Sequence, residues 1–257
     1  MNSIKEIKRN ILKASMDANE GHIGSSFSVL DILYVLYEKV ANISPELLEK
    51  EDRDRVILSK GHASLAHAAI LAEKGFISFD QLYSYCSSSS ILGGHLSKLS
   101  VPGVEVSTGS LGHGISVSVG IALALKIRHL DSKVFCIVGD GEINEGTFWE
   151  SLLLIAHHDL RNLKIIIDYN HSNDRALKLD PLEKKLLAFG FEVLQIDGHS
   201  HSKLEKALSK KPNKHPIAII ADTIKGKGIK ELENNPAWHH KSPTQQEYKK
   251  LLKELED

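Results

Sequence analysis

The residues best suited to chemistry stand at the ends of two consecutive apolar runs. The run 134–138 leads directly into Gly139-Asp140-Gly141, and the next run, 163–168, is followed closely by Asn170. If these runs are parallel strands of one βαβ unit, the right-handed crossover places their carboxyl ends at the same edge of a sheet. Asp140 and Asn170 would then be neighbours, and their side-chain oxygens are ligands of the kind that Mg²⁺ prefers.

Two glycines flank this aspartate, and they make the turn suitable for binding a phosphate. Gly139 and Gly141 let the backbone turn sharply, and a phosphate oxygen could approach the Gly141 amide with no Cβ in the way. Open α/β sheets bind ligands at the carboxyl ends of their strands. A plain Gly-Asp-Gly turn without a metal is the simpler interpretation, and Asn170 at the next strand end is what favours a site.

A dinucleotide site is the alternative that these glycines raise. The turn after the run 134–138 lacks the Gly-x-Gly-x-x-Gly spacing of such sites, and the glycine-rich run 109–114 follows no convincing strand. The sequence therefore favours a metal-bridged phosphate over a dinucleotide.

Five short apolar runs, alternating with helical patterns, must position these residues. Most of the runs are continuous, as expected where helices cover both faces of a parallel sheet. The predicted strands are 56–58, 134–138, 163–168, 192–196 and 217–221, and the predicted helices are 4–18, 29–40, 63–73, 115–129, 147–158, 182–188, 203–209 and 244–255. This alternation predicts an α/β fold with a doubly wound, mostly parallel sheet and helices on both faces.

The composition of the chain limits the kinds of binding partner and the cellular compartment that we expect. The chain has 257 residues, and its 32 Lys and Arg nearly cancel its 33 Asp and Glu. No overall field therefore directs it to nucleic acid or to an anionic membrane, and no apolar run approaches the ~20 residues of a membrane span. Two cysteines and a start without a leader pattern predict a cytoplasmic protein. We expect one domain over 1–257, with 222–257 as a C-terminal arm and helix.

A longer motif surrounds Asp140: Gly139-Asp140-Gly141-Glu142-Ile143-Asn144-Glu145-Gly146, followed by Trp149-Glu150 and closed by Asn170. It resembles the thiamine diphosphate motif of the transketolase family. Further blocks in the order of that family extend the similarity along nearly the whole chain: Gly21-His22-Ile23-Gly24, 54–63, Gly93-Gly94-His95, 102–114, Lys225-Gly226-Lys227-Gly228 and Trp238-His239. The resemblance covers the N-terminal, diphosphate-binding domain of the family.

The resemblance implies a metal and thiamine diphosphate. Asp140, Asn170 and the main-chain carbonyl of Ser172 would bind Mg²⁺, or another divalent cation such as Ca²⁺ or Mn²⁺. Histidines hydrogen-bond the diphosphate in this family, and a glycine-containing loop contacts the aminopyrimidine and thiazolium rings. The implied cofactor-binding residues are His62, His239, Gly109, Leu111, Gly139, Asp140, Gly141, Glu145 and Asn170.

Two more histidines match residues that line the substrate channel of the family. His22 and His95 would hydrogen-bond substrate hydroxyls and the reacting oxygen, and they could relay protons. Glu145 resembles a buried glutamate in a network that runs between two active sites. A surface or structural role is the ordinary one for a histidine, and an adjacent glycine in a loop is what favours a site here. Histidines without that setting are expected to be structural: His67, His129, His157, His158 and His201.

The resemblance implies one half of an enzyme. Members of the family activate the cofactor with a glutamate from a pyrimidine-binding domain, for which this sequence has no assignable counterpart. We therefore expect the N-terminal subunit of a split transketolase, which forms an α2β2 heterotetramer with a C-terminal, pyrimidine-binding subunit. The complex would transfer a two-carbon ketol unit from a ketose to an aldose, with sugars or sugar phosphates as substrates. Alternatives are a related ketol or acyl transfer in specialised sugar or secondary-metabolite biosynthesis, and a catalytically silent scaffold.

The sequence also departs from the family pattern. The segment 171–181 is shorter, and Asp174 stands in an apolar place, so we expect its carboxylate to point outward or to pair with a cation. This shorter segment should shape specificity rather than metal binding. His240 stands where the family usually has glycine. Small residues in 115–125 favour close helix packing against another copy or a partner over a role in the site.

Overall fold

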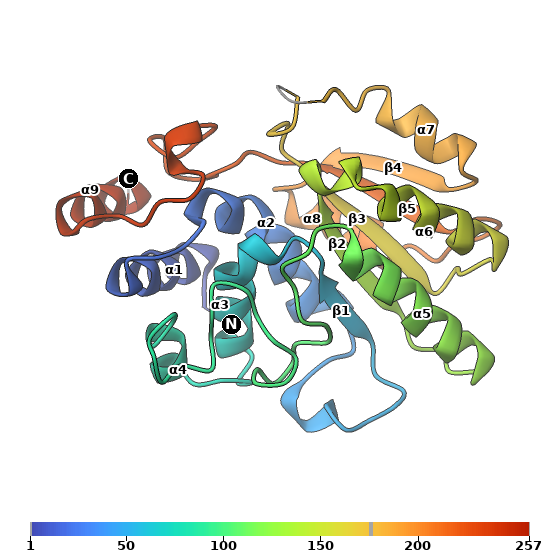
Figure 1. The fold of residues 1–257 in the computed structure, drawn as a ribbon, viewed down its shortest axis with the longest axis horizontal. Coiled ribbons are helices and arrows are strands. Elements are labelled where there is room, and N and C mark those ends of the chain that lie inside the picture. The colour runs from blue at the N-terminus through green and yellow to red at the C-terminus, as the bar shows by residue number, and fades with distance from the viewer. Residues whose placement is uncertain (1, 175–176, 257) are drawn as a thin grey trace.

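One parallel sheet forms the centre of the computed structural model, which describes residues 2–174 and 177–256 (Figure 1). Its strands are β1 (Arg55–Leu58), β2 (Val134–Gly139), β3 (Leu163–Tyr169), β4 (Glu192–Asp197) and β5 (Ile217–Asp222). Their spatial order is β1-β2-β3-β5-β4, with every neighbouring pair parallel. The five predicted strands are confirmed, each within one residue of its predicted ends.

Burial of the strands follows their place in the sheet. Every residue of β2 and β3 is buried, as their continuous apolar runs predict, whereas the edge strand β4 is half-exposed. Successive side chains of a strand point to opposite faces. Phe135 and Ile137 accordingly join one core, while Val134, Cys136 and Val138 join the core on the other face.

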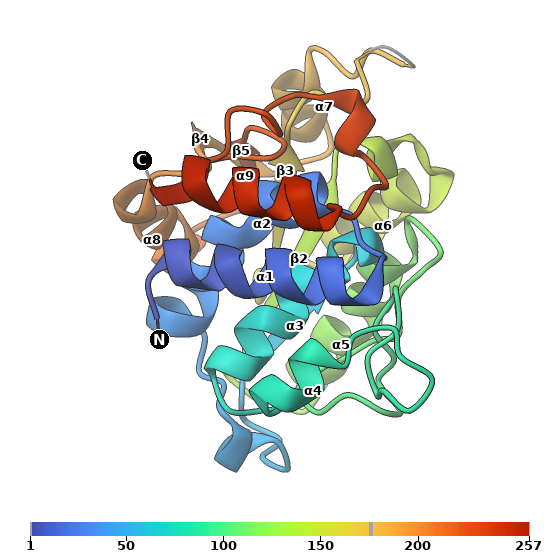
Figure 2. The ribbon, with the colours of Figure 1, turned by 90° about the vertical axis from the view of Figure 1, so that its left-hand side faces the viewer.

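Helices cover both faces of the sheet, which confirms the predicted doubly wound fold. One face is covered by α2 (Ile23–Val35), α3 (Ser64–Glu73) and α8 (His201–Ser209), with α1 (Ile4–Ala18) packed against α2 and α3. The other face is covered by α5 (His113–Ile127), α6 (Gly146–His157) and α7 (Leu182–Ala188). Helix α9 (Gln245–Glu256) lies beside α1, so the two ends of the chain meet on one side of the molecule (Figure 2).

Two helical features differ from the prediction. Helix α2 begins at Ile23, well before the predicted start at residue 29, and continues as a π-helical turn, Leu36–Val40. Every residue of α2 except Tyr34 is buried, and a helix that is buried all round lacks the amphipathic period that marks a start. The short helix α4 (Phe79–Tyr83) was not predicted, although Ser78 and Gln81 form a capping box at its start.

The chain after β5 runs in a series of turns past the start of α2 to α9 and forms the predicted C-terminal arm and helix. Gly226 has a φ of +80°, and a Cβ at this position would lie 2.3 Å from the Leu232 carbonyl oxygen, so only glycine fits the turn. The Gly226 amide donates to the Gly24 carbonyl at 2.9 Å, which ties the arm to α2. The division of the domain at residue 222 stays a prediction. Within the described residues, no helix has both the length and the apolar character needed to cross a bilayer.

Candidate functional site

A cavity of about 390 Å³ lies at the carboxyl ends of the central strands. Its walls come from the loops after β1, β2 and β3, from the loop before α5 and from the arm. The lining includes eleven of the twelve predicted site residues, all except Glu145: His22, His62, His95, Gly109, Leu111, Gly139, Asp140, Gly141, Asn170, Ser172 and His239. Residues more than two hundred positions apart in sequence thus meet at one sheet edge, as open α/β folds favour.

Asp140 follows β2 directly and is almost completely buried. Its carboxylate accepts hydrogen bonds from the backbone amides of Gly141, at 2.8 Å, and Asn173, at 3.2 Å. Burial raises the pKa of this carboxyl above its usual value, and the two amides act in the opposite direction. A divalent cation would stabilise the ionised form of such a group.

Asn170 follows β3, one residue beyond the strand. Its amide nitrogen donates to the Ser28 hydroxyl at 3.0 Å, which fixes the orientation of the side chain. The amide oxygen therefore faces Ser172, whose backbone amide donates to it at 3.1 Å. Carboxylate, amide and main-chain oxygens from Asp140, Asn170 and Ser172 are a hard donor set, and its chemistry fits Mg²⁺ or a similar divalent cation.

A wall of nitrogen donors stands across the same cavity. Lys225 lies 2.5 Å from His239, between their Nζ and Nδ1 atoms, and the ring centroids of His62 and His239 are 6.3 Å apart. Burial, followed by the charge of Lys60, lowers the pKa of Lys225 to about 8 and that of His62 to about 2. The pKa of His239 is lowered as well, by burial and then by Lys225. Burial is the main cause of these shifts, and the smaller contributions of Lys60 and Lys225 reflect nearby positive charge, which favours an anion.

His22 and His95 line the cavity close to this wall. The His22 ring lies 5.7 Å from the rings of both His62 and His239, and burial lowers its pKa to about 4. At neutral pH its imidazole is uncharged and can both donate and accept a hydrogen bond. A Cβ on Gly61 would come within 2.8 Å of His95, so glycine at 61 makes room for that ring.

A buried ion pair beneath the cavity was missed in the sequence. Lys60 pairs with the Asp168 carboxylate, and both side chains are almost inaccessible to solvent. Asp168 also accepts hydrogen bonds from the hydroxyls of Ser28, at 2.8 Å, and Thr223. Lys60 follows β1 and Asp168 lies in β3, and β2 stands between these two strands, so the strand pairing predicted from the sequence did not bring the two residues together. This network ties the ends of β1, β3 and β5 to Ser28 of α2, which also accepts the hydrogen bond from Asn170.

Glu142 is a second positioning residue that was missed. It is buried and accepts hydrogen bonds from the amides of Gly112, at 2.8 Å, and Gly139, at 3.2 Å, and from the Ser59 hydroxyl. It therefore joins the loop that carries Gly109 and Leu111 to the end of β2. Glu145, predicted to be a buried network residue, is exposed in this single chain at the start of α6, and its role stays a prediction.

The short segment after Asn170 places its charge as expected. Asp174 is exposed and hydrogen-bonds His171, 3.0 Å away, which confirms the expectation that this carboxylate points outward or pairs. Arg175 and Ala176 of the same segment lie outside the described residues. A neighbouring hollow of about 490 Å³ is lined by His171 and by the arm, and it shares Asn170, Ser172, Lys225 and His239 with the cavity.

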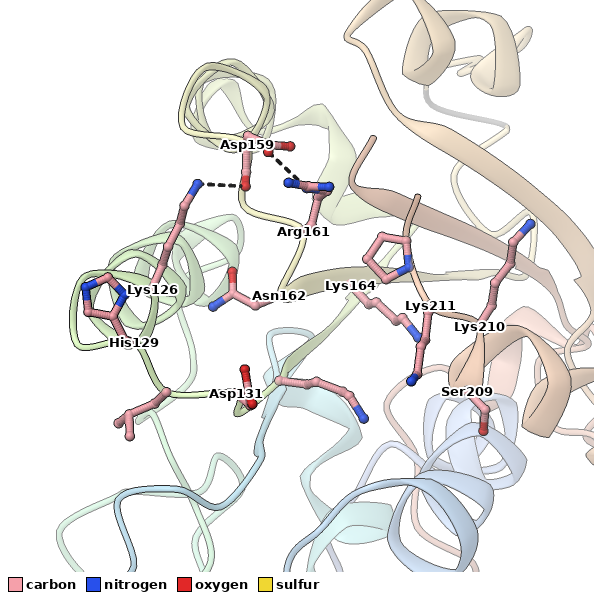
Figure 3. Close-up of a pocket in the computed structure, with 13 residues that line it drawn as sticks. Lys126, His129, Asp131, Asp159, Arg161, Asn162, Lys164, Ser209, Lys210 and Lys211 are labelled. Atoms are coloured by element: carbon pink, nitrogen blue, oxygen red, sulfur yellow. Dashed lines mark hydrogen bonds and ion pairs between the residues drawn. The ribbon is translucent and has the colours of Figure 1, made fainter. Parts of the chain in front are cut away.

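The opposite end of the sheet carries a larger cavity, of about 530 Å³ (Figure 3). Its lining is rich in lysine and arginine, and several of these side chains are engaged by the protein. Lys126 donates to the main-chain oxygen of Asp159 at 3.1 Å, Arg161 pairs with the Asp159 carboxylate at 2.9 Å, and Lys164 donates to the Leu208 carbonyl. None of the twelve predicted site residues is among the described residues that line it.

The predicted structural histidines have mixed outcomes. His67 is buried and hydrogen-bonds the Tyr37 hydroxyl at 2.8 Å, which confirms a structural role. His201 lies 2.7 Å from the Asp31 carboxylate, away from the cavity lining. His129 lies at the mouth of the larger cavity (Figure 3).

Comparisons with known proteins agree with the geometry of the first cavity. Residues 2–255 match the sequence family described as "Transketolase, thiamine diphosphate binding domain". An apulose-4-phosphate transketolase subunit from Actinobacillus succinogenes is 42% identical, over 98% of this chain and 94% of its own length. A 6-deoxy-6-sulfo-D-fructose transketolase subunit from a Clostridium species is 36% identical, over 92% of this chain and 88% of its own.

A solved structure extends the agreement to the fold. The transketolase of Campylobacter jejuni matches with a TM-score of 0.87 at 31% sequence identity. The match covers 100% of this chain and 43% of that one, so the chain spans less than half the length of the solved enzyme. The parallel sheet and its helical layers are therefore shared along the whole match.

Proposed function

Because the chain belongs to the transketolase family, as its thiamine diphosphate binding domain, we propose that it serves as the N-terminal subunit of a two-subunit transketolase. In this proposal residues 1–257 form one diphosphate-binding domain. The observation that carries the proposal is the cavity in which the oxygens of Asp140 and Asn170 face Lys225, His62 and His239. Metal ligands opposite nitrogen donors fit a diphosphate that is bridged to a divalent cation.

The metal ligands proposed are the Asp140 carboxylate, the Asn170 amide oxygen and the Ser172 carbonyl. Mg²⁺ is the cation that this hard set favours, and Ca²⁺ or Mn²⁺ could replace it. Gly139 and Gly141 leave the approach to the metal free of side chains. Thiamine diphosphate, when bound, supplies a carbon nucleophile that stores the electrons of a cleaved carbon–carbon bond.

The roles proposed for the remaining residues follow from their position in the cavity. His62 and His239 donate hydrogen bonds to the diphosphate, and Gly109 and Leu111 contact the rings of the cofactor. His22 and His95 hold substrate hydroxyls and move protons at the reacting oxygen. An imidazole that is neutral at pH 7 suits this task, because it can accept a proton and return it.

The exposed face of α5 and α6 has features of a surface that contacts another subunit. Val117, Leu153 and Leu154 present apolar side chains to solvent with exposures of 42%, 61% and 48%. A Cβ at Gly120 would meet no atom within 4 Å in this chain, so another helix could approach closely there. We assign this face to assembly with a C-terminal, pyrimidine-binding subunit in an α2β2 heterotetramer, in which Glu145 would become buried.

The substrate class proposed is an anionic ketose. The two relatives carry the names of apulose-4-phosphate and of 6-deoxy-6-sulfo-D-fructose, and both names describe sugars with an anionic group. Ketol transfer would move two carbons from such a ketose to an aldose. His171 and Ser172, at the start of the segment 171–181, line the neighbouring hollow, where a group of this kind could enter beside the arm.

Reconstitution tests the proposal. The purified chain alone should show no ketol transfer with thiamine diphosphate and Mg²⁺, and addition of the C-terminal subunit should create activity. Turnover by the chain alone, in a preparation free of host transketolase, would refute the two-subunit assignment. Cofactor binding without activity in the reconstituted complex would favour the silent scaffold instead.

A further inference from the structure

Three potential metal ligands gather beside the cavity, apart from the oxygen ligands already assigned. One nitrogen each of His22 and His240 and one carboxylate oxygen of Glu20 lie within 4.8 Å of one another. The two imidazole rings stack with their centroids 4.4 Å apart, and His240 Nε2 lies 2.7 Å from Glu20 Oε1. A β-bridge between His22 and Lys241 fixes the backbone of the arm against the start of α2, so this grouping is built into the fold.

We propose that Glu20, His22 and His240 bind a transition-metal ion of the Zn²⁺ class, with the fourth position of the ion open to the cavity. Two imidazoles, one carboxylate and an open position make up the ligand set of many reactive zinc sites. His22 lines the cavity, so water or a sugar hydroxyl would complete the coordination from that side. With the ion bound, the metal-bound nitrogen of His22 would not move protons, and that task would fall to His95. Imidazole ligands favour Zn²⁺ over Mg²⁺, which prefers oxygen, so this site differs in kind from that of Asp140 and Asn170.

The distances suit such an ion, and the His240 ring must turn out of its stack on His22 before both imidazoles can point at it. Zinc bonds of about 2.0 Å in a tetrahedron separate the ligand atoms by roughly 3.3 Å. The present separations bracket that value, from 2.7 Å between His240 and Glu20 to the limit of 4.8 Å for the group. The side chains of His240 and Glu20 are 59% and 37% exposed, so they can rotate without disturbing the core.

The hydrogen bonds of Glu20 leave an oxygen for the metal. Oε1 accepts from the Gly21 amide at 3.0 Å and from His240. Oε2 has no hydrogen-bond partner among residues 2–174 and 177–256. The Gly21 amide can therefore hold the carboxylate in place while Oε2 binds the ion, and the proton shared with His240 leaves as the metal enters.

Calorimetric titration of the untagged chain with Zn²⁺, without cofactor or C-terminal subunit, tests the site. The wild type should bind one ion, and Co²⁺ in its place should give the visible spectrum of a four-coordinate ion. Glu20→Gln and His240→Gly should each weaken Zn²⁺ binding by at least about 100-fold, since loss of outer-shell partners alone costs 10–100-fold. His215→Gly, at an exposed histidine remote from the cavity, is the matched control and should leave the affinity unchanged.

Two comparisons make the outcome decisive. Zn²⁺ binding should persist in excess Mg²⁺ and in Asp140→Ala, because neither touches the imidazole ligands. Wild-type Zn²⁺ affinity in His240→Gly or Glu20→Gln, with thermal unfolding showing folded variants, would overturn the proposal, as would displacement of Zn²⁺ by Mg²⁺. Since no cofactor or second subunit is present, the result is independent of the transketolase assignment.

Discussion

Lysines are buried at both ends of the sheet, but their partners differ. At the carboxyl ends, Lys60 pairs with the buried Asp168 carboxylate, and Lys225 lies against the His239 imidazole. At the amino ends, Lys164 donates to the main-chain carbonyl of Leu208, in the last turn of α8. One end thus places cations beside other ionisable groups, and the other uses a cation to complete the end of a helix.

The difference explains why the larger cavity is the weaker candidate. A lysine that already donates a hydrogen bond to a helix carbonyl is less available to bind a ligand. The carboxyl end of a helix also disfavours an anion nearby. At the other end, cations and neutral imidazoles face the oxygens that we propose as metal ligands, so an anion and a divalent cation together would satisfy both walls. The groups that contact the lysines favour the smaller cavity, of 390 Å³, as the site, although the other cavity is larger, at 530 Å³.

The largest expected effect is the loss of the buried ion pair. Lys60→Met leaves the buried Asp168 side chain without its cation, which should lower the free energy of unfolding by about 3–5 kcal/mol. Lys164→Met at the other end removes a hydrogen bond to a neutral carbonyl and should cost about 1 kcal/mol. Urea unfolding of both variants measures the contrast, and equal losses would show that the two ends are not different in kind.

The second-largest effect is expected in metal-dependent cofactor binding, which should be lost at one end of the sheet and unaffected by a change at the other. Asp140→Ala removes the anionic ligand from a donor set of hard oxygens and should weaken Mg²⁺-dependent binding of thiamine diphosphate by about 100-fold or more. Asp131→Ala, in the lining of the larger cavity, is the matched control and should leave cofactor affinity unchanged. Calorimetry on the reconstituted complex gives both values. Unchanged affinity in Asp140→Ala would remove the metal assignment.

The fold was largely predictable because most strands are continuous apolar runs and because helices such as α1, α8 and α9 are amphipathic. The start of α2 was not, since its first turn holds Gly24, Ser25 and Ser26, small residues that become buried by packing of neighbouring elements. Local pattern carries no information on such burial. The capping box at Ser78, by contrast, was a readable signal for α4.

The site was predictable in part because its histidines adjoin glycines in recognisable blocks. The resemblance located His22, His62 and His95, and the crossover rule alone brought Asp140 and Asn170 together. The pair formed by Lys60 and Asp168 could not be inferred in the same way, because a charged residue in sequence is ordinarily a surface residue. The contact between His240 and Glu20 depends on the fold of the arm, which no local pattern specifies.

A smaller effect should distinguish a substrate contact from a cofactor contact within the same cavity. His95→Ala should reduce turnover of the reconstituted enzyme by about tenfold, the worth of one lost hydrogen bond. Cofactor affinity should stay at the wild-type value, because His95 lies beside Gly61 and is assigned to the substrate rather than to the metal or the diphosphate. Steady-state kinetics with calorimetry checks both. A parallel loss of cofactor affinity would place His95 with the diphosphate ligands instead.

The smallest expected effect is on the pH dependence of stability. Without cofactor, Lys164 and Lys225, at opposite ends of the sheet, should contribute to it in the same way. Burial lowers the pKa of Lys164 to about 8, with a further contribution from Lys133, and burial and Lys60 lower that of Lys225 to about 8. Between pH 8 and the ordinary value of 10.5, the unfolded chain binds a proton that the folded chain has released. The free energy of unfolding therefore rises with pH in this window, by at most about 1.4 kcal/mol per pH unit for each lysine.

Saturating magnesium thiamine diphosphate should change the pH dependence of the free energy of unfolding at one end of the sheet only. The diphosphate would favour the charged form of Lys225 and raise its pKa, so the contribution of Lys225 to the pH slope should vanish. The contribution of Lys164, at the other end of the sheet, should persist with and without cofactor. Unfolding of wild type, Lys164→Met and Lys225→Met at several pH values measures both contributions. A cofactor effect on the slope that survives in Lys225→Met and disappears in Lys164→Met would place the anion at the amino ends of the strands and reverse the comparison.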